Sequence, residues 1–117
     1  MKTHYKPLQM GEHQLLPIVQ GGMGIGVSAH RLASAVAREN GIGTIASVDL
    51  RHLHPDLLAE SLVEPSEDKY NQLNRQALHR EITQALGDSE GRGLIAVNVM
   101  KAVSGTNQND KPSTPRW

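Results

Sequence analysis

Leu16-Pro-Ile-Val-Gln20, followed by Gly21-Gly-Met-Gly-Ile-Gly26, is the stretch that decides the fold of this 117-residue chain. A short apolar run that ends at glycines is typical of a buried strand, and the segment behind it, led by Ser28, is typical of a helix start. Four of the six residues in the intervening loop are glycines. Because glycine has no Cβ, a flat or anionic ligand can approach the backbone there, and backbone N–H groups can donate to it. We therefore expect the chemistry of the protein in this loop.

The composition narrows the classes of function. Lysine plus arginine equals aspartate plus glutamate at 12 each, so no overall field attracts nucleic acid or an anionic membrane. The chain has no cysteine, which removes disulfides, thiolate metal sites and cysteine nucleophiles. No apolar run approaches the roughly 20 residues of a membrane span, and the polar start does not resemble a secretory signal. We expect a cytoplasmic protein with neither nucleic-acid nor membrane partners.

Helical and strand periodicities alternate along the chain. Behind the predicted N-cap, Ser28, apolar residues recur on one helical face, and Gly41 is predicted to end this helix in the left-handed conformation. The apolar run 43–48 predicts a strand buried on both faces. Pro55 is suited to the first turn of a short helix over 55–62.

The second half of the chain repeats this alternation. Ser66 is the predicted N-cap of a long helix, acidic residues occupy its first turn, and Gly87 is predicted to end it. The apolar run 94–100 predicts a third strand. With 3% aromatic residues, the core must be aliphatic. Residues 1–14 are interpreted as a polar lead-in with a short edge strand.

The order strand, helix, strand, helix, strand predicts an α/β protein with parallel strands and right-handed crossovers. Residues 1–104 would form one domain. The remaining segment, 105–117, holds two prolines and no aliphatic residue, so we predict that it is a disordered tail.

The glycine loop fits the nucleotide-binding templates poorly. A P-loop needs Lys followed by Ser or Thr after its glycines, and here no lysine lies between Lys6 and Lys69. A dinucleotide fingerprint can be placed on 24–29, with Asp49 as the ribose-binding acid. That frame leaves four residues between the strand and its first glycine. A dinucleotide-binding half-domain and a purely structural turn both stay open as alternatives.

Asn98 is the unusual residue of the third strand, because the residues around it are apolar. A buried amide without a partner costs about 1 to 3 kcal/mol, so we expect it to have one. In parallel α/β folds ligands bind at the carboxyl ends of the strands, and Asn98 lies near that end, at the same edge as the glycine loop. The alternative is that its side chain ties a neighbouring loop.

Three segments together resemble the amino-terminal part of the nitronate monooxygenases, also called 2-nitropropane dioxygenases: Pro17-Ile-Val-Gln-Gly-Gly-Met-Gly24, Gly41-Ile-Gly-Thr-Ile45 and Ala96-Val-Asn-Val-Met100. The flavin-dependent enoyl-ACP reductases, and the enoyl reductases of polyunsaturated fatty acid synthesis, look like the same family. The resemblance covers roughly residues 15–104. It implies a (β/α)₈ TIM barrel that binds FMN and either oxidises nitronates with dioxygen or reduces enoyl thioesters.

The resemblance also implies the cofactor-binding residues. Gly22, Met23 and Gly24 would place backbone against the flavin ring, and Asn98 would hydrogen-bond the cofactor with its side chain. Backbone N–H groups near the flavin N5 can tune its electronics. Family members commonly have Pro at the position of Gly22, so this chain departs from the pattern there.

Length is the larger departure from the family. A full barrel takes about 250 residues and closes eight strands, whereas three are predicted here. The family's phosphate-binding loops and catalytic histidine come after the third strand, so no catalytic residue is predicted in this chain. We expect a truncated, inactive amino-terminal fragment of about three βα units that self-associates through an exposed sheet edge. A non-enzymatic remnant or interaction module that pairs through the same edge is a second hypothesis.

The histidines offer little to a site. The one ligand-like cluster lies in the segment 49–56. If this segment is extended, alternate residues share one face, as a metal site requires. Its charged residues and a proline favour a solvated connection instead, so no metal site is predicted. His30 and His79 are predicted at the surface. The members of the one ligand-like cluster are Asp49, His52, His54 and Asp56.

Overall fold

The computed structural model describes residues 5–24 and 26–99. The chain is a mixed α/β protein, as predicted, in which two small sheets are combined with helices. The predicted tail, 105–117, lies outside the described residues. In chain order the elements are β1 (Leu8–Met10), β2 (His13–Leu15), α1 (His30–Arg38), β3 (Ile42–Ala46), the short 3₁₀ helix η1 (Leu50–Leu53), α2 (Pro55–Val63), α3 (Glu67–Asp88) and β4 (Leu94–Asn98).

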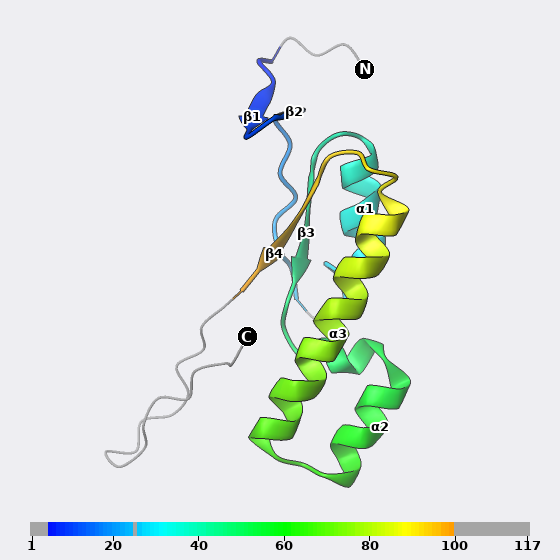
Figure 1. Cartoon of the computed structure of the whole chain (residues 1–117). Helices are drawn as coiled ribbons and strands as arrows, with labels where there is room; N and C mark the ends of the chain where they lie inside the picture. The colour runs from blue at the N-terminus through cyan, green and yellow to red at the C-terminus, as the bar shows by residue number, and fades with distance from the viewer. Residues whose placement is uncertain (1–4, 25, 100–117) are drawn as a thin grey trace, which may run out of the picture.

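The parallel pair of β3 and β4 is the centre of the fold. The register runs from Ile42 opposite Leu94 to Ala46 opposite Asn98, and Figure 1 shows both strands pointing the same way. Every residue of β3 is buried, which confirms the prediction of a fully buried strand. Because β3 and β4 are joined through η1, α2 and α3, they form the predicted strand–helix–strand unit.

The predicted first strand, Leu16–Gln20, is reduced to a single bridge, between Val19 and Ile42. It runs parallel to β3, and Ile42 N–H donates to Ile18 O at 2.9 Å. The pairing stops there because the side chain of Gln20 takes the next β3 position, where Thr44 N–H donates to Gln20 Oε1. The prediction of a regular strand was therefore wrong in extent, although the chain direction was right.

Both predicted ends of α1 were one residue off. Its N-cap is Ala29, which makes no side-chain capping bond, because the Ser28 hydroxyl is used by the glycine loop. At the other end Asn40, with φ of 66°, adopts the left-handed conformation predicted for Gly41. Apart from glycine, asparagine is among the residue types that tolerate this conformation best.

The predictions for α2 and α3 hold more closely. Pro55 begins α2, and the Ser66 side chain accepts from Lys69 N–H at 3.2 Å as the N-cap of α3. Gly87 does not end α3, which continues to Asp88. The left-handed positions that follow are taken by Glu90 and Gly91 instead.

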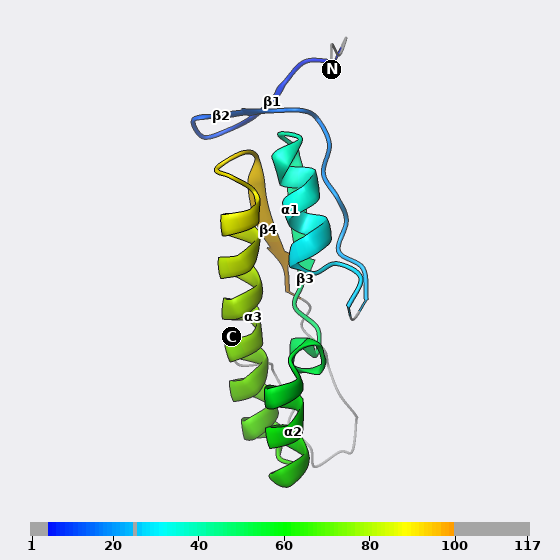
Figure 2. The ribbon, with the colours of Figure 1, turned by 90° about the vertical axis from the view of Figure 1, so that its right-hand side faces the viewer.

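The core lies between the sheet and the two helices α1 and α3, which cover the same side of β3 and β4 in both views (Figures 1 and 2). Gly43 allows this close packing, because a Cβ there would overlap the Ala33 carbonyl of α1. The core extends along α3 toward α2. Its fully buried members are all aliphatic, as predicted: Ala33, Ile45, Leu50, Leu57, Leu73, Ala77 and Ala85.

The β1–β2 pair is a separate antiparallel hairpin, with Leu8 opposite Leu15. It lies at the end of the molecule from which β3 and β4 start (Figure 1). The predicted short edge strand is thus a hairpin. Among the described residues, no helix combines the length and the apolar character that crossing a membrane requires.

Candidate functional site

A pocket of about 180 Å³ lies where β3 and β4 end, and we call it the rim pocket. It brings the glycine loop and the end of β4 together, two segments about 75 residues apart in the chain. All four residues predicted to bind a cofactor line it. The lining consists of Gly22, Met23, Gly24, Ala46, Val48 and Asn98.

Gly22 packs directly against Asn98. A Cβ built on Gly22 would overlap the Asn98 side chain, whereas a Cβ on Gly21 or Gly24 would meet open space. Any larger residue at position 22 would have to displace the Asn98 side chain. The glycine is therefore required by its neighbour rather than by a left-handed backbone.

Asn98 is exposed, not buried as its apolar neighbours predicted. Its backbone carbonyl accepts from Ser47 N–H at 3.1 Å and from Ser47 Oγ at 2.8 Å. Its side-chain amide makes no hydrogen bond to any residue in 5–24 or 26–99. Within the described residues this side chain therefore does not tie a neighbouring loop, and Asn98 is one of the residues that line the rim pocket.

Ser28 fixes the glycine loop, a role that the sequence did not reveal. Its side chain is 1% exposed. The hydroxyl oxygen accepts from Met23 N–H at 2.7 Å and from the Gln20 side-chain amide at 3.1 Å. The Met23 N–H is therefore already used, so the backbone of this residue offers a ligand less than predicted.

Gln20 extends the sheet with its side chain. Its Oε1 accepts from Thr44 N–H at 2.9 Å, and its Nε2 donates to Thr44 O at 3.1 Å. The same Nε2 lies 3.0 Å from Gly21 O. One side-chain amide thus imitates a strand residue beside β3 and holds the first residue of the glycine loop at the same time.

Asp49, the ribose-binding acid of the dinucleotide alternative, is not among the residues that line the rim pocket. Its carboxylate accepts from Arg51 Nη1 at 2.6 Å. Arg51 in turn stacks over the Tyr70 ring, with 4.4 Å between its Cζ and the ring centroid. The geometry therefore gives the dinucleotide alternative no support.

A second pocket, of about 400 Å³, lies between α3, the start of α1 and the start of α2. Its base is the Glu81 carboxylate, whose side chain is 2% exposed. Oε2 lies 2.6 Å from His30 Nδ1 and accepts from His30 N–H at 2.8 Å, and Oε1 lies 3.1 Å from His54 Nε2. Glu81 joins three elements and supplies the acceptor that Ala29 does not provide at the start of α1.

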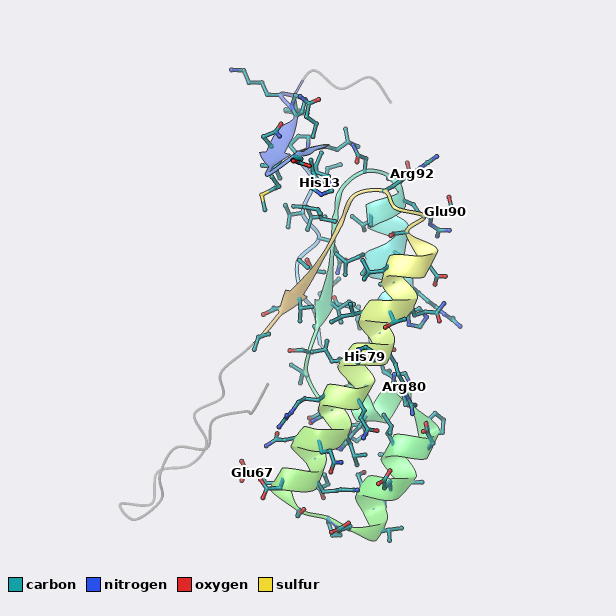
Figure 3. The ribbon with its side chains drawn as sticks, in the orientation of Figure 1. His13, Glu67, His79, Arg80, Glu90 and Arg92 are labelled. Atoms are coloured by element: carbon teal, nitrogen blue, oxygen red, sulfur yellow. The ribbon has the colours of Figure 1, made fainter. Side chains whose placement is uncertain are left out.

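The Glu81 cluster corrects one of the two predictions made for the helix histidines. His30 is partly buried and hydrogen-bonded to Glu81, so its placement at the surface was wrong, whereas His79 is exposed as predicted. Figure 3 shows His79 and Arg80 midway along α3. The signal that sequence reasoning overlooked is the spacing of Glu81, which falls four residues from both Ala77 and Ala85 on the buried face of α3.

Three members of the ligand-like cluster, Asp49, His54 and Asp56, have side-chain partners outside it. Asp56 and Arg80 form a bidentate pair at 2.9 and 2.8 Å, and His54 bonds to Glu81. No group of three or more histidine, aspartate or glutamate side chains within 5–24 and 26–99 could hold a metal ion.

Surface ion pairs account for the clear pKa shifts. The side-chain hydrogen bond from Arg80 lowers the pKa of Asp56 to about 2. The Asp56 hydrogen bond likewise raises the pKa of Arg80, and the hydrogen bond to Glu60 raises the pKa of Lys69. All three groups lie away from the rim pocket.

No protein-family model matches the chain, and it matches no curated protein and no solved structure.

Proposed function

We propose that the chain contributes the ring-facing part of an FMN site in an oxidoreductase of the nitronate monooxygenase type, built from the first βα units of a (β/α)₈ barrel. One observation carries the proposal. Gly22, Met23, Gly24 and Asn98, which the resemblance singled out in two distant segments, line one pocket at the carboxyl ends of parallel strands. Ligands of open α/β and barrel folds bind at that edge.

The chemistry of the rim pocket suits the ring of a flavin better than its phosphate. Ala46 and Val48 provide apolar surface for a flat ring, and the Asn98 amide supplies both a donor and an acceptor for the polar ring edge. None of the six lining residues is basic. A phosphate would therefore be held by residues other than these.

Bound FMN would supply the redox chemistry, which is transfer of electrons from a nitronate to dioxygen in the favoured activity. The residues of this chain would bind and orient the ring. Gly22 and Gly24 would let the backbone approach one side of it, and Asn98 would fix its rotation in the plane. An enoyl reductase of fatty acid synthesis would use the same contacts to the flavin. The rim pocket therefore supports the flavin site, and the choice of the nitronate activity rests on the resemblance alone.

The test is a titration of the full chain with FMN, monitored by quenching of flavin fluorescence. Asn98→Ala should weaken binding about three- to tenfold, because one hydrogen bond to the ring is lost. Gln76→Ala, which removes an exposed amide from α3, is the matched control and should bind as the wild type does. A wild-type chain that leaves flavin fluorescence unchanged contradicts the proposal.

A second candidate, an interaction module, is favoured by apolar surface beside the sheet. Ile18 and Val19 are 53% and 60% exposed. Ile18 also lines an apolar hollow of about 280 Å³ together with Ala35 and Val36. Sedimentation equilibrium without FMN distinguishes the two candidates, because a discrete oligomer that binds no flavin supports the module.

A further inference from the structure

Two buried serines, Ser28 and Ser47, stand behind the rim pocket without lining it. Each is 1% exposed. Ser28 lies just before α1, and Ser47 directly follows β3. A buried hydroxyl is costly unless it is hydrogen-bonded, so the partners of each serine indicate what it does.

Ser28 is bonded to the glycine side of the pocket. Its Oγ accepts from Met23 N–H at 2.7 Å and lies 3.5 Å from Gly21 O. These two contacts hold the residues on either side of Gly22. Gly22 is thereby fixed where its Cα packs against Asn98.

Ser47 is bonded to the opposite side of the pocket. The last ladder pair of the sheet is Ala46 with Asn98, and Ser47 comes one residue later. Its N–H and its Oγ both donate to Asn98 O, at 3.1 and 2.8 Å. This double contact holds the end of β4 beside β3, and so determines where the Asn98 side chain starts.

We propose that Ser28 and Ser47 are the positioning residues of the rim pocket, with Ser28 fixing the glycine side and Ser47 fixing Asn98. Neither hydroxyl touches the ligand. Each holds its side of the pocket in the binding conformation before a ligand arrives. The effect of the two hydroxyls on FMN binding rests on the proposed flavin function, whereas their effect on the backbone does not depend on it.

Removal of either hydroxyl should lower affinity without unfolding the chain. In Ser28→Ala the Met23 N–H loses its acceptor, and in Ser47→Ala one of the two donors to Asn98 is lost. The loop or strand end would then populate the binding conformation only part of the time, and the apparent dissociation constant rises as that population falls. A lost hydrogen bond of ordinary strength corresponds to a change of about two- to tenfold.

Ser61 provides the matched control. It is 2% exposed in α2, and its Oγ donates to Leu58 O at 2.6 Å. Ser61→Ala therefore removes an equally buried hydroxyl with a local helix bond, far from the pocket. All three alanine variants and the wild type are compared by FMN titration, by urea unfolding and by amide hydrogen exchange in NMR.

We expect the Met23 amide to exchange about tenfold faster in Ser28→Ala, and the residue 47 amide to exchange faster in Ser47→Ala. FMN affinity should fall two- to tenfold in both variants and stay unchanged in Ser61→Ala. If the wild type binds no FMN, the proposed function fails, and exchange alone decides the role of the serines. Unchanged exchange at Met23, equal FMN affinity in all four proteins, or an equal loss of affinity in Ser61→Ala would each refute the inference.

Discussion

Replacement of Glu81 by alanine is the sharpest test of how the helices are held together. The carboxylate is 2% exposed and bonds to His30 twice and to His54 once. Its removal breaks the hydrogen bonds that join α3 to the start of α1 and to the start of α2. It also leaves the His30 N–H without an acceptor.

The magnitude follows from the partners. Leaving a buried hydrogen-bonding group without its partner costs about 1–3 kcal/mol, and more for charged groups. The two histidine side chains are 29% and 19% exposed, so water can replace part of what they lose. Because three hydrogen bonds to the carboxylate are lost together, we expect Glu81→Ala to lower the free energy of unfolding by about 3 kcal/mol.

Urea unfolding followed by far-UV circular dichroism measures this change. A loss of about 3 kcal/mol moves the midpoint by about 1–3 M urea for the slopes of small proteins. Glu60→Ala is the matched control, because Glu60 also accepts a side-chain hydrogen bond, from Lys69, but is 50% exposed; exposed pairs contribute little. Equal midpoints for the two variants would show that Glu81 does not join the three elements.

Three further predictions concern single positions. Gly43→Ala should lower the free energy of unfolding by about 2 kcal/mol or more, since the new Cβ meets the backbone of α1. Gly87→Ala has open space around the new Cβ and should stabilise α3 by about 0.5–1 kcal/mol. Thermal unfolding of both variants measures the difference. Gln20→Ala should lower the free energy of unfolding by about 1–3 kcal/mol, because the N–H and C=O of Thr44 lose their partner. Gln84→Ala, which removes an exposed amide, is the control and should leave the urea midpoint unchanged. The pKa of Asp56 is lowered from 3.8 to about 2 in the folded chain, so its contribution to stability is present above pH 3.8 and is lost as the pH falls toward 2. Asp56→Asn should therefore flatten the fall of the urea midpoint between pH 4 and pH 2, and an unchanged slope there would contradict this assignment.

Predictions from the sequence succeeded where one local rule decides the outcome. Pro55 begins α2 because its missing N–H needs no partner in the first turn, and Ser66 caps α3 because its side chain accepts from an N–H of the first turn. The buried β3 followed from its continuous apolar run. The convergence of Gly22 and Asn98 at one pocket followed from the rule that parallel strands share a carboxyl edge.

Predictions failed where a distant residue competes for the same group. Ser28 has the right chemistry for an N-cap, but the N–H of Met23 takes its hydroxyl. The predicted long helix behind Ser66 gave no indication of Glu81, whose buried carboxylate is bonded to His30 and His54 from other elements. Such pairings are set by tertiary contact, which the spacing of one helix cannot reveal.

The Gln20 side chain, which takes a strand position beside β3, affects how copies of the chain can associate. On the outer side of 16–20, Pro17 has no N–H to offer, and the ladder position beyond Ile42 is already filled by the Gln20 amide. That edge is a poor template for an added strand. β4 pairs only with β3 among the described residues, so it is the edge left to accept one. Two copies that paired through β4 would each use the same edge, and this isologous arrangement closes as a two-fold pair.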